Sequence, residues 1–182
     1  HRLTERVLEK LLERPNIYHI TSEMQENIPL ASALHDIGKI AIDEKILNKP
    51  GRLTPEEFEV IKTHTTIGAD MLSKLENFCE EPLLQTAYSI ARWHHERWDG
   101  RGYPDGLKGN EIPIEAQVVA LADVYDALTS DRCYKKACPH EQAVKMILNG
   151  ECGAFNPVLL ECFVEIEDDL KRDLEEEHRN KA

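Results

Sequence analysis

The sequence predicts an all-α protein. Apolar residues recur at helical spacing in almost every segment, and no segment alternates apolar and polar residues as a half-buried strand does. Proline, threonine and glycine stand where helices are expected to begin and end. With 182 residues, the chain is long enough for one well-buried domain and short for two. We therefore expect a single helical-bundle domain over residues 1–182.

The predicted helices can be placed in order along the chain. The first covers residues 2–14 and stops at Pro15. The second leads into His35, and Pro29 either kinks it or starts its last segment. A third begins at Thr54, followed by a proline at the first helical position and a glutamate placed for a capping box. Further helices are expected from Pro82 to His95, from 114 to 131, from 139 to 149 and, at the C-terminus, from 157 to about 177, and residues 98–113 form the one long loop.

The composition excludes two classes of function. A net charge of −12 argues against a general DNA-binding surface, which needs a basic face. It still allows a small anionic ligand, because bound divalent metals reverse the local sign of the charge. No apolar run approaches the ~20 residues of a membrane span. The five cysteines form no CxxC pair, which is typical of reduced thiols in a cytoplasmic protein.

Side chains that can hold metal ions stand on four successive predicted helices. Metal sites for hydrolysis use imidazole and carboxylate ligands, with no thiolates to crowd out a reactive water. The two oxygens of Asp36 can bridge two ions ~3.5–4 Å apart, and a hydroxide between such ions attacks phosphodiesters at neutral pH. Each residue alone is more often an ordinary core or surface group, but their joint, ordered occurrence favours a metal centre. The candidate ligands are His35, Asp36, His64, His94, His95 and Asp123.

A series of motifs between residues 30 and 157 carries a family resemblance. The motifs are LHDIGKIAI at 34–42, LNKPGRLTPEEFEVIKTHTTIG at 47–68, HHERWDGRGYPDGLKG at 94–109, IP at 112–113, ALADVYDALTSDRCYK at 120–135 and FNP at 155–157. This series resembles the HD superfamily of metal-dependent phosphohydrolases, and specifically its HD-GYP branch.

The resemblance implies a helical bundle that holds two or three metals and hydrolyses bacterial cyclic di-GMP. We expect two divalent ions here, bound by the six candidate ligands with Asp36 as the bridge. Iron or manganese is favoured by the resemblance, and zinc, nickel and magnesium remain alternatives.

Further residues are assigned to the substrate by the same resemblance. Lys39 is similar to the lysine that meets the scissile phosphate, and Arg132 and Lys135 match a phosphate-holding pair. Asp126 lies on the same helical face as Asp123 and corresponds to an aspartate near the metal-bound water. It either acts on that water or orients a ligand. Asp36, Lys39 and Asp126 are thus the predicted catalytic residues.

The Gly-Tyr-Pro loop has two interpretations. Its glycines can simply allow tight turns beneath Trp98 and Tyr103. Alternatively, Tyr103 and Arg101 border the substrate groove or face a partner. In the family this loop is linked to binding of diguanylate cyclase (GGDEF) domains, so such a domain is an expected partner.

The first helix departs from the family pattern. Longer members carry a ligand histidine there, and the neighbours of His1 do not match that position. We expect the first helix to be truncated, with the chain a fragment of a larger protein that has a sensory or receiver domain upstream.

The leading hypothesis is a cyclic di-GMP phosphodiesterase that opens the ring to pGpG, with further cleavage to GMP left open. A metal-bridging hydroxide would be the nucleophile. One alternative is a regulatory module that binds a cyclic dinucleotide or a partner without turnover. Another is an HD phosphohydrolase with a different nucleotide substrate.

Overall fold

The chain folds into α-helices joined by turns and two short 3₁₀-helices, and the described residues contain no strand. The computed structural model describes residues 2–131 and 136–181. The all-α prediction is confirmed. The elements are α1 (Arg2–Leu12), α2 (Ser22–Ser32), η1 (Ile37–Ala41), α3 (Glu44–Leu47), α4 (Pro55–Ser73), α5 (Pro82–Trp93), η2 (Gly109–Glu111), α6 (Ile114–Thr129), α7 (His140–Leu148), α8 (Pro157–Glu165) and α9 (Glu167–Lys181).

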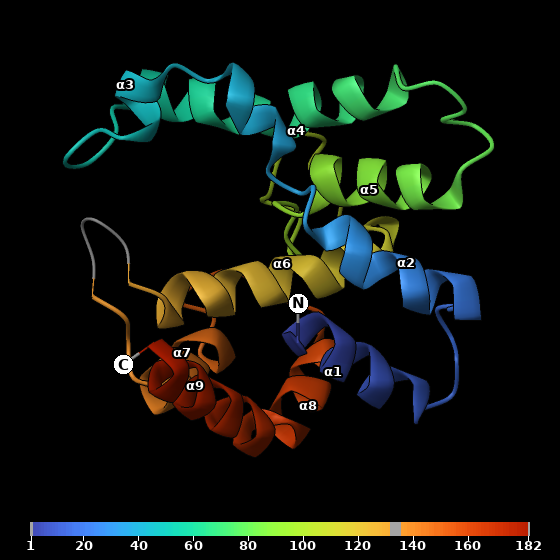
Figure 1. The fold of residues 1–182 in the computed structure, drawn as a ribbon, viewed down its shortest axis with the longest axis vertical. Helices are drawn as coiled ribbons and strands as arrows, with labels where there is room; N and C mark the ends of the chain where they lie inside the picture. The colour runs from blue at the N-terminus through green and yellow to red at the C-terminus, as the bar shows by residue number, and fades with distance from the viewer. Residues whose placement is uncertain (1, 132–135, 182) are drawn as a thin grey trace.

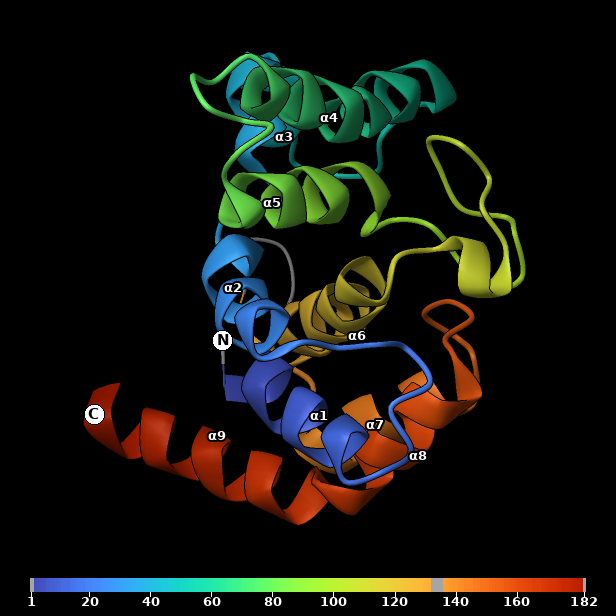
Figure 2. The ribbon, with the colours of Figure 1, turned by 90° about the vertical axis from the view of Figure 1, so that its right-hand side faces the viewer.

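Helices α2 and α6 lie between two groups of helices (Figures 1 and 2). Helices α3, α4 and α5 form one end of the molecule, and α1, α7, α8 and α9 form the other. Helix α5 packs against α2, α4 and α6. The loop after α5 projects to one side in Figure 2 before the chain enters α6.

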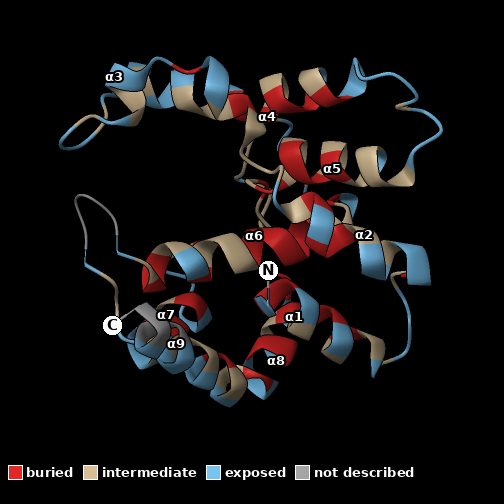
Figure 3. Ribbon diagram, viewed as in Figure 1, coloured by how far each residue is buried: buried red, intermediate tan, exposed pale blue. Residues whose placement is uncertain are grey.

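Helix α6 lies at the centre of the core. All six residues from 116 to 121 are buried, so this stretch is covered on every side rather than along one stripe. Figure 3 shows the buried faces of α5, α6 and α8 turned inward. Phe163 of α8 and Leu8 of α1 are among the largest fully buried side chains. The side chains that α6 carries beyond this stretch are therefore held on a rigidly packed helix.

Helix α4 begins as predicted. Thr54 Oγ1 accepts a hydrogen bond from the backbone N–H of Glu57, and the Glu57 carboxylate accepts one from the backbone N–H of Thr54. This reciprocal capping satisfies two N–H groups that the helix leaves without intrahelical partners. The cap fixes where α4 begins and hence which face of the helix carries His64.

The predicted helix leading into His35 ends earlier than expected. Pro29 lies inside α2, which stops at Ser32. From there the chain tightens into bonds between residues three apart, such as Leu34 N–H to Ala31 O and Lys39 N–H to Asp36 O. His35 and Asp36 therefore stand in the turn between α2 and η1 rather than on a continuous α-helix.

The predicted helix from 157 to about 177 is two helices. The chain turns at Ile166, which is buried, and α9 then continues in a new direction. Arg6 of α1 donates two hydrogen bonds to Asp173 of α9, which ties α9 to the first helix. Burial of Ile166 and this ion pair fix the bend, and helical periodicity alone did not reveal it.

Among the described residues, no helix combines the length and apolar character that a membrane crossing needs.

Candidate metal centre

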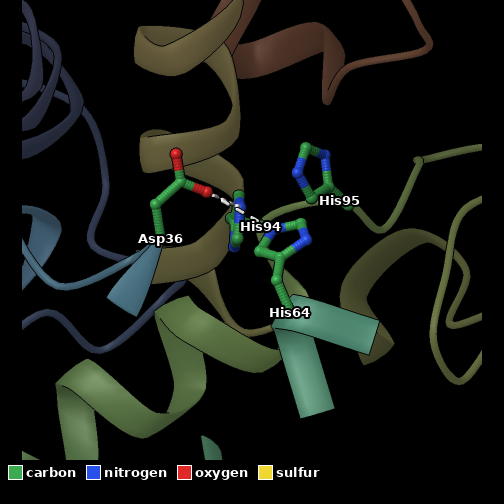
Figure 4. A group of neighbouring side chains, drawn as sticks. All are labelled: Asp36, His64, His94 and His95. Carbon is green, nitrogen blue, oxygen red and sulfur yellow. Dashed lines mark ion pairs between the residues drawn. The ribbon is translucent and has the colours of Figure 1, made fainter. Parts of the chain in front are cut away.

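Four of the predicted ligands lie together where α2, α4 and α5 converge (Figure 4). Asp36 comes from the turn before η1, His64 from α4, and His94 and His95 from the end of α5. One potential ligand atom from each lies within 4.8 Å of the others. His64 and His94 are buried, whereas Asp36 and His95 are half-buried. The group is thus enclosed on one side and accessible on the other.

Backbone carbonyls orient three of the imidazole rings. His35 Nδ1 lies 2.6 Å from Ser32 O, and His64 Nδ1 lies 2.6 Å from Ile61 O. His94 Nδ1 lies 2.8 Å from Ile90 O. A carbonyl only accepts, so each Nδ1 carries a proton and donates it, which leaves Nε2 with a free lone pair whenever the ring is neutral. This arrangement fixes the tautomer that a metal ligand requires.

Buried polar atoms without partners meet at the centre. Asp36 Oδ1, His64 Nε2 and His94 Nε2 are buried and have no hydrogen-bond partner. Asp36 Oδ1 lies 3.3 Å from His64 Nε2 and 3.8 Å from His94 Nε2. Unsatisfied buried polar atoms are costly and rare, and three acceptors that converge on one point fit a bound cation. The donor set, imidazole and carboxylate, is compatible with a divalent metal ion.

The other oxygen of Asp36 faces a second group of donors. His35 Nε2 lies 3.3 Å from Asp36 Oδ2 and 3.5 Å from Asp123 Oδ1, with Asp123 supplied by the central helix α6. The His35 and His94 rings meet edge to face with centroids 5.1 Å apart. The two oxygens of Asp36 therefore point to two different sets of candidate ligands, as a bridging carboxylate requires.

The backbones of η1 and α4 approach each other closely beside the centre. A Cβ atom at Gly38 would lie 1.9 Å from the carbonyl oxygen of His64, so only glycine allows η1 to rest on α4 at this distance. Gly68 of α4 faces the same contact, and a Cβ atom there would lie 3.1 Å from the Gly38 nitrogen. This approach brings the Asp36 turn within reach of His64.

The two histidines that directly follow α5 are neutral at physiological pH. Burial and neighbouring histidines lower the pKa of His94 to about 3 and that of His95 to about 4. Burial also lowers the pKa of His64. Neutral imidazoles have the free lone pair that a metal requires.

His35 behaves differently in the absence of a metal. Burial lowers its pKa, but hydrogen bonds and charge from Asp123 and Asp36 outweigh burial and raise it to about 10. Burial likewise opposes ionisation of Asp36, yet His35 and Lys39 hold the pKa of that carboxyl well below its usual range. Protonated His35 and Lys39 thus supply the positive charge that the two carboxylates need without a cation.

The predicted catalytic and phosphate residues fall at different places. Lys39 Nζ lies 2.6 Å from Asp36 Oδ2, at the edge of the centre. Asp126 is exposed and accepts a hydrogen bond from Ser130. It lines a cavity of about 470 Å³ together with His35 and Asp123. Arg132, Lys135 and His1 lie outside the described residues.

Tyr103 of the Gly-Tyr-Pro loop lies against the centre, whereas Arg101 does not. The Tyr103 ring stacks on His95 with centroids 4.9 Å apart, and its backbone N–H donates to His95 O. Burial, with the charges of Asp36 and Asp123, raises the pKa of Tyr103, so its hydroxyl stays protonated. The Arg101 side chain is 83% exposed and lies 3.8 Å from Asp99.

Glu96 organises this loop and was not predicted from the sequence. Its buried carboxylate accepts hydrogen bonds from the backbone N–H groups of residues 105, 106 and 107, at 2.7–3.0 Å. Arg92 and Trp93 of α5 both donate to Asp105 and fix the other side of the loop. A carboxylate directly after two candidate ligands and before a glycine-rich loop was the available signal.

A family model described as the HD domain matches residues 2–155. The chain belongs to the HD domain family. This membership, predicted from the motifs, is confirmed together with the resemblance to the HD-GYP branch.

Curated relatives share the motif-bearing region of this HD domain chain. It is 49% identical over 143 residues to a cyclic di-GMP phosphodiesterase of Thermotoga maritima, covering 79% of this chain and 38% of the relative. It is 45% identical over 138 residues to the cyclic di-GMP phosphodiesterase response regulator RpfG of Xanthomonas campestris pv. campestris, covering 76% and 35%. A 3'3'-cGAMP-specific phosphodiesterase 2 of Vibrio cholerae is 38% identical over 150 residues, covering 82% and 28%. The chain thus spans well under half the length of these relatives.

A solved structure shares the fold. The crystal structure of a cyclic GMP-AMP specific phosphodiesterase from V. cholerae (V-cGAP3) superposes with a TM-score of 0.59, at 15% identity, over 94% of this chain and 46% of that chain. This similarity supports the helical architecture of the HD domain chain.

Proposed function

We propose that residues 1–182 form one HD-GYP domain, which hydrolyses cyclic di-GMP to pGpG at a centre of two divalent metal ions. The carrying observation is Asp36, whose two oxygens face separate groups of candidate ligands. When bound, the ions would activate water for attack on phosphorus and neutralise charge on the phosphate. Iron or manganese is the expected metal. Cleavage of pGpG to GMP is a second step that the same assay would detect.

The chain's own residues would place the substrate. Lys39, at the edge of the centre, would exchange its contact with Asp36 for one with a phosphate oxygen. Arg132 and Lys135 would hold the same phosphate, because they follow α6 directly in sequence. As negative charge develops on the phosphate oxygens, these cations would stabilise it. Asp126, in the cavity that also contains His35 and Asp123, would accept a proton from water or orient a ligand.

The wider setting is also part of the proposal. One relative's name includes "response regulator", which supports a receiver domain upstream of the HD domain in the complete protein. We propose a cytoplasmic location, where cyclic di-GMP would be available, and a GGDEF domain as a partner of the Gly-Tyr-Pro loop.

The test is product formation by protein purified without air and loaded with iron or manganese. Cyclic di-GMP should yield linear pGpG, detected by chromatography. Asp36→Ala should abolish turnover, whereas Asp70→Ala, at an exposed position of α4 where the carboxylate pairs with Lys74, should leave it unchanged. Absence of product with both metals, in this chain and in one lengthened at its N-terminus, would refute the proposal.

A second candidate substrate is favoured by the relatives. Several are named 3'3'-cGAMP-specific phosphodiesterases, at 34–38% identity. Competition between cyclic di-GMP and 3'3'-cGAMP, followed by the kcat/KM ratio, separates the two substrates. The higher identity to the cyclic di-GMP enzymes makes cyclic di-GMP the first choice.

A further inference from the structure

Two side chains of α4 extend the centre toward solvent. The Phe58 ring meets the Tyr103 ring edge to face with centroids 6.2 Å apart, and Tyr103 in turn stacks on His95. Lys62 Nζ lies 5.1 Å from the Phe58 ring centroid and 5.6 Å from that of Tyr103. We call Phe58, Lys62 and Tyr103 the aromatic–lysine cluster. Only Tyr103 was assigned a role from the sequence.

The cluster is not explained by packing of the core. Phe58 remains 44% exposed, one turn after the Thr54 cap, where a polar residue would serve the helix equally well. Lys62 pairs with Glu59 at 2.6 Å, but Glu59 is highly exposed. Such surface pairs contribute little to stability, so the ammonium can turn to another acceptor. An exposed aromatic ring and a cation are thus held together beside the candidate metal centre.

The position suits a nucleobase. Tyr103 contacts both Phe58 and His95, so Phe58 lies only one ring away from a candidate ligand. In a nucleotide, a single sugar joins base and phosphate, so a phosphate at the centre carries its base to about this distance. Bases stack on aromatic side chains, with an energy of about 1–3 kcal/mol per base. Guanine also presents O6 and N7 as acceptors for a lysine.

We propose that the aromatic–lysine cluster is a subsite for one purine base of the cyclic dinucleotide. The base stacks on Phe58, and Lys62 donates to acceptors on the edge of the base. This inference rests on the proposed function only in that the phosphate lies at the Asp36 centre. Phe58 and Lys62 would then determine which substrate binds, without taking part in the bond cleavage.

A binding comparison tests the subsite without turnover. Isothermal titration calorimetry of the metal-loaded protein compares GMP with ribose 5-phosphate, which has the phosphate and sugar but no base. We expect GMP to bind at least about fivefold more tightly, the lower end of base stacking. Phe58→Ala should remove that preference while ribose 5-phosphate binds as before. Equal affinities in the unaltered protein, or no binding of either ligand, would overturn the subsite.

Matched variants separate stacking from a general loss of structure. Phe58→Leu keeps an apolar side chain and should lose the preference, whereas Phe58→Trp should keep it. Lys62→Ala should weaken GMP binding, and Lys74→Ala, an exposed lysine at the end of the same helix, should not. Retention of the GMP preference by Phe58→Ala and Lys62→Ala would contradict the proposal.

Kinetics distinguish this inference from the proposed function. With cyclic di-GMP, Phe58→Ala should raise KM about fivefold or more, while hydrolysis of methyl 4-nitrophenyl phosphate, which has no base, stays constant. If the unaltered protein prefers GMP through Phe58 but does not cleave cyclic di-GMP, the subsite stands and the proposed function fails. If the unaltered protein cleaves cyclic di-GMP, and Phe58→Ala and Lys62→Ala both have an unchanged KM, the function stands and the subsite fails.

Discussion

Gly38 and His64 are in backbone contact across the candidate centre, and any side chain at position 38 would collide with the His64 carbonyl. The contact involves main-chain atoms of η1 and α4, so no rotamer change can relieve a collision there. The turn that carries Asp36 and the helix that carries His64 are therefore held at a fixed separation.

We expect Gly38→Ala to lower both stability and metal affinity. Overpacking costs typically ~1–3 kcal/mol, and the backbone on both sides places this site at the upper end of that range. Gly68→Ala, whose Cβ would lie 3.1 Å from the Gly38 nitrogen, should have a smaller effect. Thermal melts and metal titrations of the two variants provide the comparison. Equal effects would show that the contact at Gly38 is not the limiting one.

At the proposed two-metal centre, Asp36→Ala should leave at most one weakly held ion. The reason is that one carboxylate faces both groups of ligands. Elemental analysis of protein purified without air measures the metal content. Lys39→Ala, which removes the neighbour of Asp36 but no candidate ligand, is the control and should keep its metal. Full metal content in Asp36→Ala would exclude the bridging role.

Glu96→Ala should loosen the Gly-Tyr-Pro loop. Loss of the carboxylate leaves three backbone N–H groups without an acceptor, at a cost of roughly 1–3 kcal/mol for a buried group. Hydrogen exchange at residues 105–107 should accelerate, and KM should rise because Tyr103 is no longer fixed on His95. Glu96→Gln retains one acceptor oxygen, so its exchange rate and its KM should lie between those of the unaltered protein and those of Glu96→Ala. Unchanged exchange in Glu96→Ala would mean that Arg92 and Asp105 suffice to hold the loop.

The metal-free protein should lose stability as the pH rises from about 6.5 to about 10. The pKa of His35 is raised from its ordinary value near 6.5 to about 10 in the folded state. The folded state therefore binds the His35 proton more tightly than the unfolded state does. This stabilisation is complete below about pH 6.5 and disappears as the pH approaches 10.

Thermal melts of metal-free protein across this range check that dependence. His35→Gln should show a flatter profile, and His19→Gln, at an exposed position, should match the unaltered protein. The same slope in all three proteins would assign the pH dependence to other groups.

The sequence predicted which residues gather at the centre because each candidate ligand is tied to an ordered motif. All six, from His35 to Asp123, do converge in the structure. The capping box at Thr54 was also recognised, since its partners are only three residues apart. Interactions between neighbours in sequence leave a local pattern, and such patterns can be read directly.

Features that depend on distant contacts were not predicted. The turn that carries His35 and Asp36 was taken for helix, because the close approach of Gly38 to α4 leaves no mark on periodicity. The bend at Ile166 depends on burial against other helices. Glu96 was overlooked because its partners are backbone N–H groups, which any sequence provides.

The candidate ligands come from four stretches of chain that are far apart in sequence, namely the turn after α2, α4, the end of α5, and α6. Metal bound there would tie these stretches together at one point of the folded state, and because the unfolded chain has no preformed site, the free energy of metal binding would add to the stability of the fold. Removal of the metal by a chelator would then do more than stop the proposed hydrolysis. It would release the end of the molecule formed by α3, α4 and α5 from the central helix α6, and that end would unfold at a lower temperature than the rest.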